Sequence, residues 1–145
     1  MTRFTLILTL LLAWSALSYS QQAKFPDHLE DINNLPASLY DVKGVGQWKK
    51  GSDAGQIRLV IARSNKRDEV YLQWVKWNQK GPEKVVSTVM VKEIQASANY
   101  KTTFIRTENV GEKRIIVLGL ENLYDKTSSK AEIEVIEIGR YSCTI

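Results

Sequence analysis

The stretch VYLQWVKW, residues 70–77, decides how the rest of this 145-residue chain is interpreted. It holds the densest group of aromatic side chains in the sequence, with Tyr71, Trp74 and Trp77 within seven consecutive positions. Such rings form either an exposed binding platform or the interior of a β-protein. The two interpretations place the same side chains on different faces of a strand, so the alternation of polar and apolar residues distinguishes them.

Val70, Leu72 and Trp74 would share one face of a strand, because successive side chains alternate at about 3.3 Å per residue. This row is apolar and ends at Lys76, which is typical of a row that faces a core. Burying one large aromatic side chain removes about 200 Å² from water, which is worth about 5 kcal/mol at most. We therefore expect Trp74 to lie in the core.

Tyr71 and Trp77 would point to the opposite face, about 20 Å apart along the strand. One strand therefore does not supply a stacking platform by itself. Trp48, in the lysine-rich segment QWKK, and Tyr124, in the polar loop ENLYDKTSSK, are further candidates for exposed rings. Trp77, Trp48, Tyr71 and Tyr124 are thus the candidate binding residues, and the sequence indicates no catalytic or metal-binding residue.

Residues 1–20 have the layout of a secretory signal peptide, with a positive charge at Arg3, an apolar run and then small residues. Ser18 and Ser20 would occupy positions −3 and −1 if cleavage precedes Gln21, and cleavage after Ser18 is the alternative. The apolar run is shorter than the roughly 20 residues that span a bilayer. We expect an exported protein, periplasmic or secreted, without a stable membrane anchor.

The remaining chain, residues 21–145, has the size of one domain with one core. Loss of Arg3 would lower the formal net charge from +4 to +3. Basic and acidic residues are interleaved, as in SNKRDE, whereas nucleic-acid-binding proteins usually gather one sign of charge on one face. This pattern argues against a nucleic-acid partner.

Cys143 is the only cysteine, so the chain forms no internal disulfide and must be held together by apolar burial. Its thiol is either a small buried apolar group or a site of pairing between two chains. His28 is the only histidine, and neither a zinc site of the usual type nor a histidine-dependent nucleophile is indicated. No cofactor is expected.

From residue 42 onward, apolar residues alternate with polar ones, and turn residues recur every 8 to 15 positions. The expected strands are VGQWKK, QIRLVIAR, EVYLQWVKW, KVVSTVMVKEI, NYKTTFIRT, RIIVLGL and AEIEVIEI. We predict an all-β fold, a single antiparallel β-sandwich of about seven or eight strands at 42–145, with a small closed barrel as the alternative. Residues 21–41 would form a short irregular or helical arm before it.

Two of these strands have irregular patterns. KVVSTVMVKEI is apolar at both parities, which predicts a central strand or one bent by a bulge. In AEIEVIEI, Ile133 and Val135 share one parity, whereas Ile136 and Ile138 have the other. A β-bulge switches faces in this way, and burial on both faces near the strand end is the alternative.

Three functions fit these features. The preferred one is a non-catalytic exported domain that binds another protein, as an envelope adaptor or an inhibitor would. The second is a carbohydrate-binding domain in which Trp77, Trp48 or Tyr71 stacks on sugar rings. The third is a hydrolase with paired carboxylates, although acids that alternate with apolar residues, as in AEIEVIE, are explained by solvated positions.

Overall fold

The structure is a computed structural model that describes residues 34–111 and 113–145. The signal peptide expected at 1–20 and the residue His28 lie outside the described residues, as does most of the arm expected at 21–41. The chain divides into two units, Met1–Leu35 and Pro36–Ile145.

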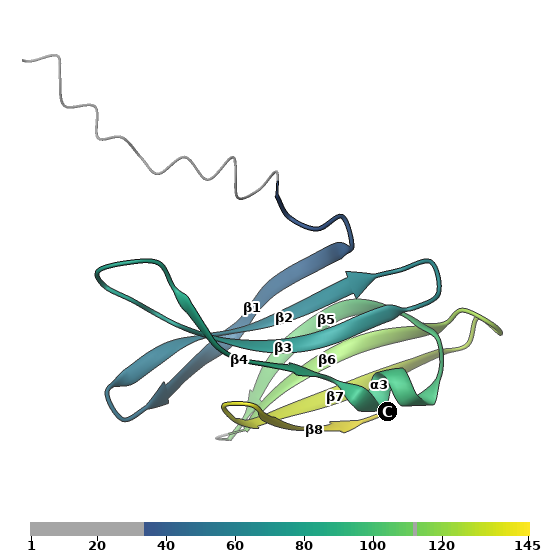
Figure 1. Cartoon of the computed structure of the whole chain (residues 1–145). Coiled ribbons are helices and arrows are strands. Elements are labelled where there is room, and N and C mark those ends of the chain that lie inside the picture. The colour runs from purple at the N-terminus through teal and green to yellow at the C-terminus, as the bar shows by residue number, and fades with distance from the viewer. Residues whose placement is uncertain (1–33, 112) are drawn as a thin grey trace, which may run out of the picture. The chain divides into compact units, whose positions relative to one another are not determined.

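The second unit contains two antiparallel sheets, each of four strands in the order of the chain (Figure 1). Sheet 1 consists of β1 (Leu39–Lys50), β2 (Asp53–Arg63), β3 (Asp68–Lys76) and β4 (Lys84–Met90). A short helix, α3 (Lys92–Ser97), leads to sheet 2, which consists of β5 (Tyr100–Val110), β6 (Lys113–Asn122), β7 (Ser128–Glu137) and β8 (Arg140–Thr144). β1 begins at Leu39, six positions before the expected first strand VGQWKK and three positions before the expected start of the sandwich at 42.

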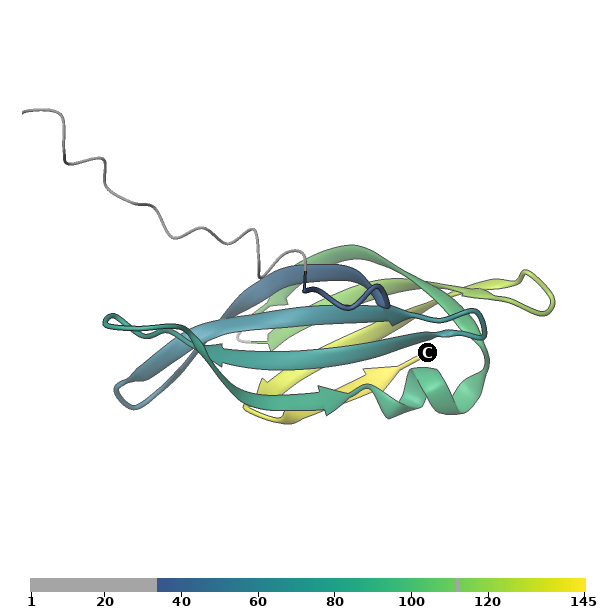
Figure 2. The same ribbon diagram turned by 45° about the horizontal axis from the view of Figure 1, so that its top comes forward.

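The two sheets pack face to face, as the turned view in Figure 2 shows. In the part of the chain that the structure describes, no strand of one sheet is hydrogen-bonded to a strand of the other, so the sheets do not close into a barrel. The prediction of an antiparallel β-sandwich is confirmed. The number of strands, eight, agrees with the alternation of the sequence.

The core lies between the sheets and is built from alternate residues of each inner strand. In β3, Val70, Leu72 and Trp74 are completely buried, which confirms the interpretation of VYLQWVKW. The same alternation places three large aliphatic side chains of β2 and three of β6 in this core: Ile57, Leu59, Ile61, Ile116, Leu118 and Leu120. The hydrophobic effect on these facing rows is what joins the two sheets.

The buried carboxylate of Asp68, which forms an ion pair with Arg63 within sheet 1, also connects the two sheets. Asp68 of β3 accepts two hydrogen bonds from Arg63, at 2.9 and 2.8 Å, and a third from the backbone N–H of Thr102 in β5, at 2.7 Å. The carboxylate holds the pKa of Arg63 above its ordinary value. Because a buried carboxylate needs partners, this arrangement fixes how β5 lies against sheet 1.

The prediction of one long strand over KVVSTVMVKEI is wrong for the last residues of this segment. β4 ends at Met90, and the residues that follow form α3, in which Ile94 is buried. The side-chain hydroxyl of Tyr141 in β8 accepts a hydrogen bond from the Lys92 N–H at 3.0 Å, so a distant strand supports the start of the helix. That contact depends on the packing of the two sheets and has no local signal.

The sequence of β4 predicted either a central strand or a strand bent by a bulge. β4 lies at the edge of sheet 1, so the first alternative is wrong and the second is confirmed. Its pairing with β3 passes from Ser87 to Val85, which leaves Val86 as the extra residue. The bulge expected from AEIEVIEI is confirmed as well. Pairing between β7 and β8 jumps from Val135 to Glu137 and leaves Ile136 unpaired and half exposed.

Candidate functional site

The outer face of sheet 1 carries an uncharged row that crosses all four strands. Val42 of β1 lies opposite Val60 of β2, Val60 opposite Tyr71 of β3, and Tyr71 opposite Met90 of β4. We call these four residues the apolar row. Val42 is 49% exposed and the other three are partly buried. Their parity is opposite to that of the core residues, so the row points away from sheet 2.

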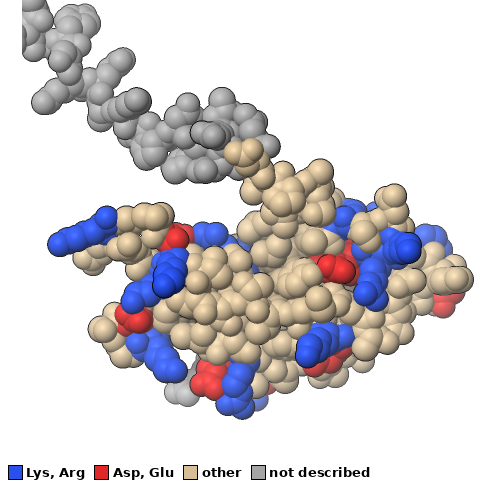
Figure 3. Space-filling view, in the orientation of Figure 1, with Lys and Arg blue, Asp and Glu red and all other residues tan. Residues whose placement is uncertain are grey.

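Polar groups border the apolar row. The Tyr71 hydroxyl donates a hydrogen bond to Glu69 at 2.7 Å, and this contact raises the pKa of Tyr71 above its ordinary value. On the other side, Arg58 forms an ion pair with Glu83 at 2.6 Å. Figure 3 shows uncharged surface over the middle of sheet 1, with charged side chains nearer its margins. The surface therefore has an apolar centre and a polar rim.

The outer face of sheet 2 carries more charge, with charged residues on three of its four strands, although Ile105 and Val110 of β5 are also exposed there. Lys113 of β6 pairs with Glu134 of β7 at 3.0 Å, and Arg106 pairs with Glu108 along β5 at 2.9 Å. The charged residues on this face are Lys101, Arg106, Glu108, Lys113, Glu121, Lys130, Glu132 and Glu134. Water solvates such a face well.

A pocket of about 380 Å³ opens at one end of the sandwich. We call it the end pocket. Its walls come from the last residues of β1, from Ile57 and Trp74 of sheet 1, and from β6 and the β7–β8 hairpin of sheet 2. The residues that line it are Gln47, Trp48, Lys49, Lys50, Ile57, Trp74, Asn109, Arg114, Val135, Ile136, Glu137 and Ile138.

Arg114 spans the two sheets beside the end pocket. Its Nη1 donates a hydrogen bond to the carbonyl oxygen of Gln47 at 2.6 Å. The guanidinium lies where a Cβ of residue 46 would be, and Gly46 has a φ of +151°, so glycine is required there for two reasons. The bulge at this point of β1 turns Val45 into the core and frees the Gln47 carbonyl for Arg114.

Trp74 forms part of the pocket wall and is 0% exposed. Its indole N–H has no hydrogen-bond partner among the described residues. A buried N–H donor without a hydrogen-bond partner costs about 1–3 kcal/mol of folding free energy. Such a donor is uncommon in a native structure and calls for an explanation. The neighbouring Trp48 is satisfied, because its Nε1 donates to the Val75 carbonyl at 3.2 Å.

The four candidate rings lie in separate places. Tyr71 belongs to the apolar row, and Trp48 lies in the end pocket, partly buried against the core. Trp77, 43% exposed, directly follows β3 of sheet 1, and Tyr124, 89% exposed, lies in the turn between β6 and β7 of sheet 2. The two most exposed of these four candidate rings therefore belong to different sheets.

Several surface residues were missed by the sequence interpretation. Val42, Val60 and Met90 gain their importance from strand register, which local alternation does not give. Arg114 had a usable signal, because it occupies the inward parity at the start of the apolar strand RIIVLGL. A charged residue at a core parity predicts either a buried partner or a site.

Cys143 points toward the interior and packs against the core from β8. Burial raises the pKa of its thiol to about 11. A protonated, partly buried thiol is a poor nucleophile and a poor partner for disulfide exchange. This placement agrees with the interpretation of Cys143 as a small apolar group.

The carboxylates of the described residues do not gather into a metal-binding cluster. The end pocket is lined by one acid, Glu137, which pairs with Arg140 at 2.6 Å. A shallower pocket on the outer face of sheet 2 is also lined by one acid, Glu121. Neither of these pockets offers the two facing carboxylates that glycoside hydrolysis uses.

Within residues 34–111 and 113–145, no helix has the length and apolar character needed to cross a membrane. In comparisons with known proteins, the chain matches no protein-family model, no curated protein and no solved structure. Function is therefore argued from the geometry of the two outer faces and of the end pocket.

Proposed function

We propose that this protein is an exported, non-catalytic domain that binds another protein through the apolar row of sheet 1. The observation that carries the proposal is the apolar row, because Val42, Val60, Tyr71 and Met90 cross all four strands of sheet 1 without a charged residue between them, whereas the Lys113–Glu134 pair links neighbouring strands of sheet 2. Apolar surface with a polar rim is typical of protein–protein interfaces.

The size of the row suits a small recognition surface. Four strands about 4.8 Å apart place its outer members about 14 Å from each other. Tyrosine and methionine are enriched in interfaces, tyrosine because its ring is large and has few rotamers to lose. All four residues stand on paired strands, so little conformational freedom is lost when a partner binds.

The partner that fits is a protein with aliphatic or aromatic side chains at the centre of its own surface. Around that centre it would meet the rim formed by Glu69 and by the Arg58–Glu83 pair. Such pairs on a rim contribute to orientation and association rate more than to affinity. Sugar stacking has less support, since Trp77 and Tyr124, the most exposed of the candidate rings, lie on different sheets.

A photo-crosslinking amino acid placed at either of two positions tests the proposal. At Val42 it would lie in the apolar row, and at Glu132 it would lie on the charged face of sheet 2. After irradiation of cells that produce each variant, we expect a discrete adduct with one protein from position 42 and none from position 132. Mass spectrometry identifies the partner and distinguishes it from a second copy of this chain.

Two results would count against the proposal. No adduct from position 42, with the purified variant folded as judged by circular dichroism, would show that the row meets no partner. Equal adducts from both positions would show contact without preference for sheet 1. The charge substitution Val42→Asp provides an independent check without the crosslinking amino acid, because it should abolish co-purification of the identified partner while Glu132→Lys leaves co-purification unchanged.

A further inference from the structure

We infer that the end pocket binds a small amphipathic anion, specifically an organic carboxylate with an apolar tail. Neither the apolar row nor protein binding requires this site, because the end pocket opens between the sheets and the row lies on the outer face of sheet 1. Three independent features of the pocket lead to this ligand: its unpaired cations, its unsatisfied N–H donor and its apolar lining.

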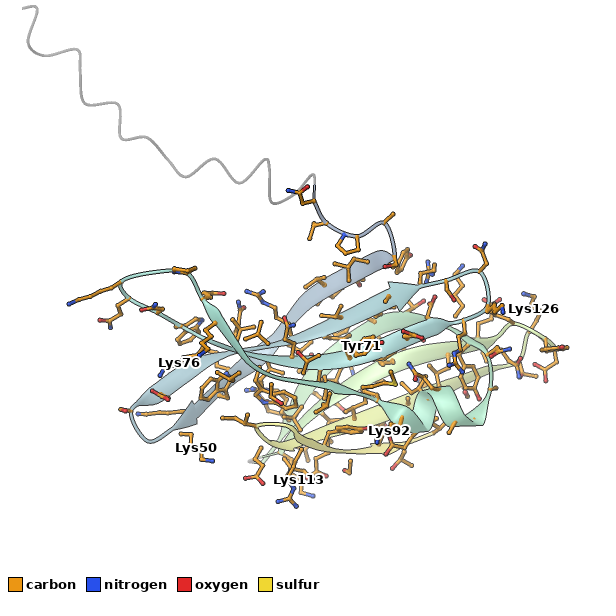
Figure 4. The ribbon with its side chains drawn as sticks, viewed as in Figure 1. Lys50, Tyr71, Lys76, Lys92, Lys113 and Lys126 are labelled. Carbon is orange, nitrogen blue, oxygen red and sulfur yellow. The ribbon has the colours of Figure 1, made fainter. Side chains whose placement is uncertain are left out.

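The charge of the lining is the first feature. Lys49, Lys50 and Arg114 contribute three positive charges, and Glu137 is the single acid. Glu137 already pairs with Arg140, whereas no carboxylate in the described part of the chain forms an ion pair with any of those three cations. Figure 4 shows Lys50 and Lys113 marking this end of the molecule on the two sheets. The electrostatic potential of these cations favours the binding of an anion in the pocket.

The second feature is the unsatisfied donor. Trp74 is completely buried, its ring forms part of the wall, and its N–H lacks a partner within the described residues. Arg114 donates only one of its N–H groups, to Gln47, among the hydrogen bonds of the described residues. The Trp74 N–H has almost no accessible surface, so a ligand acceptor reaches it only when the indole moves. The remaining N–H groups of Arg114 call for a ligand rich in acceptors, and a carboxylate offers two acceptor oxygens to a guanidinium.

The third feature is the apolar part of the lining. Trp48, Ile57, Trp74, Val135 and Ile138 contribute aromatic and aliphatic atoms to the lining, although Ile57 and Trp74 are almost completely buried. A volume of about 380 Å³ falls at the lower end of the range, roughly 300–1,000 Å³, that holds small organic ligands. A bare inorganic anion would leave this surface without contact, whereas an alkyl tail would cover it.

Calorimetric titration of the purified protein with three ten-carbon probes tests the inference. Decanoate carries the anion and the tail, decanol lacks the charge, and decyltrimethylammonium reverses it. Decanoate and decyltrimethylammonium are used below the concentrations at which they form micelles, and decanol is used below its solubility limit. We expect saturable binding of decanoate with one site per chain, binding of decanol weaker by at least about tenfold, and no binding of the cation.

Charge-reversal variants locate the site. Lys49→Glu combined with Lys50→Glu should weaken decanoate binding by at least about tenfold, because it replaces attraction by repulsion. The matched control reverses two exposed lysines elsewhere, Lys66 in the β2–β3 turn and Lys92 on α3. Both double variants change the net charge equally. A difference in their affinity for decanoate therefore reports the local effect of Lys49 and Lys50.

Trp74→Phe tests the donor separately. It keeps a six-membered aromatic ring but removes the N–H together with the rest of the pyrrole ring from a fully buried site. We expect weaker decanoate binding and a lower thermal midpoint, so binding is measured at a temperature at which circular dichroism shows the variant to be folded. Val135→Phe provides a second variant that reduces the volume of the pocket and should weaken decanoate and decanol alike. Val42→Asp, in the apolar row, should leave decanoate binding unchanged, which keeps this inference separate from the proposed protein-binding function.

The inference is overturned by any of three results. One is the absence of saturable decanoate binding up to about 1 mM, which corresponds to about −4 kcal/mol. Another is equal affinity for decanoate in both double lysine variants. The third is loss of binding in Val42→Asp with retention in Lys49→Glu/Lys50→Glu, which would place the acid on the outer face of sheet 1.

Discussion

Sheet 1 and sheet 2 have the same architecture but differ in how apolar and charged residues are distributed on their outer faces. Each is a four-stranded antiparallel meander, and each buries its inner face in the same core. On the outside, sheet 2 pairs Lys113 with Glu134 across two strands, whereas sheet 1 places Val60 opposite Tyr71. The folding of the sandwich does not need this difference, since burial between the sheets stabilises both in the same way.

The comparison indicates where the surface is available for recognition. Ion pairs on sheet 2 keep that face solvated and contribute little to stability. The apolar row of sheet 1 leaves Val42 half exposed to water, where it contributes nothing to the core. An exposed apolar group without a structural role has its greatest effect when a partner covers it.

The largest expected effect separates the inner face of sheet 1 from its outer face. Trp74→Ala removes a completely buried ring and should lower the free energy of unfolding by about 3–5 kcal/mol. Val42→Ala, on the outer face, should lower it by about 0.5 kcal/mol or less. Urea denaturation measures both. A cost for Val42→Ala similar to that of a buried valine would mean that the row belongs to the core and is not a free surface.

A smaller effect is expected where the two sheets are joined by polar contacts. Asp68→Ala leaves the Thr102 N–H and Arg63 without their acceptor and should cost about 3 kcal/mol. The adjacent Glu69→Ala, which removes one exposed contact with Tyr71, is the control and should cost about 1 kcal/mol or less. If the two substitutions have equal effects, the ion pair does not determine how β5 packs on sheet 1.

The next prediction concerns the reactivity of Cys143, whose thiol lies on the inner face of sheet 2. With a folded-state pKa of about 11, about one thiol in a thousand is ionised at pH 8, so alkylation of the native protein should be about a hundredfold slower than in urea. The folded state keeps this proton while the unfolded thiol, with an ordinary pKa of 9.0, loses it. Stability should therefore fall as the pH rises from about 9 to about 11.

Rapid native alkylation at pH 8 would contradict that placement of Cys143. A dimer on a non-reducing gel that disappears on reduction would do the same, because it would require the thiol to reach a second chain.

The smallest effect is expected on the outer face of sheet 2. A double-mutant cycle on Lys113 and Glu134, each replaced by alanine, should give a coupling of about 0–1 kcal/mol that disappears at about 1 M salt. Urea denaturation of the four proteins measures it. A coupling above about 2 kcal/mol would show that the charged face stabilises the fold, and the contrast between the faces would then have a structural explanation.

Much of the fold was predictable because its signals are local. Alternation in VYLQWVKW placed Val70, Leu72 and Trp74 in the core, and the shift of parity after Val135 located the bulge in β7. The end of β4 and the start of α3 were not predictable, since the Lys92 N–H is satisfied by Tyr141, which is 49 positions away.

The residues of the candidate sites were likewise only partly predictable from the sequence. Tyr71 and Trp48 were recognisable as aromatic side chains of interest, but their neighbours Met90 and Arg114 come from other strands. Nothing near position 74 in the sequence shows that the Trp74 N–H is left without an acceptor. That follows only from the atoms that surround the ring after the sheets have packed.

The amino-acid order alone thus determined the fold class, the inward-facing rows and the absence of an internal disulfide, because side-chain alternation and residue counts do not depend on distant contacts. The tertiary structure decided which outward residues align across four strands and which cations meet at the open end of the sandwich. Register and packing bring together groups that are far apart along the chain, and free energies of burial and pairing depend on that juxtaposition.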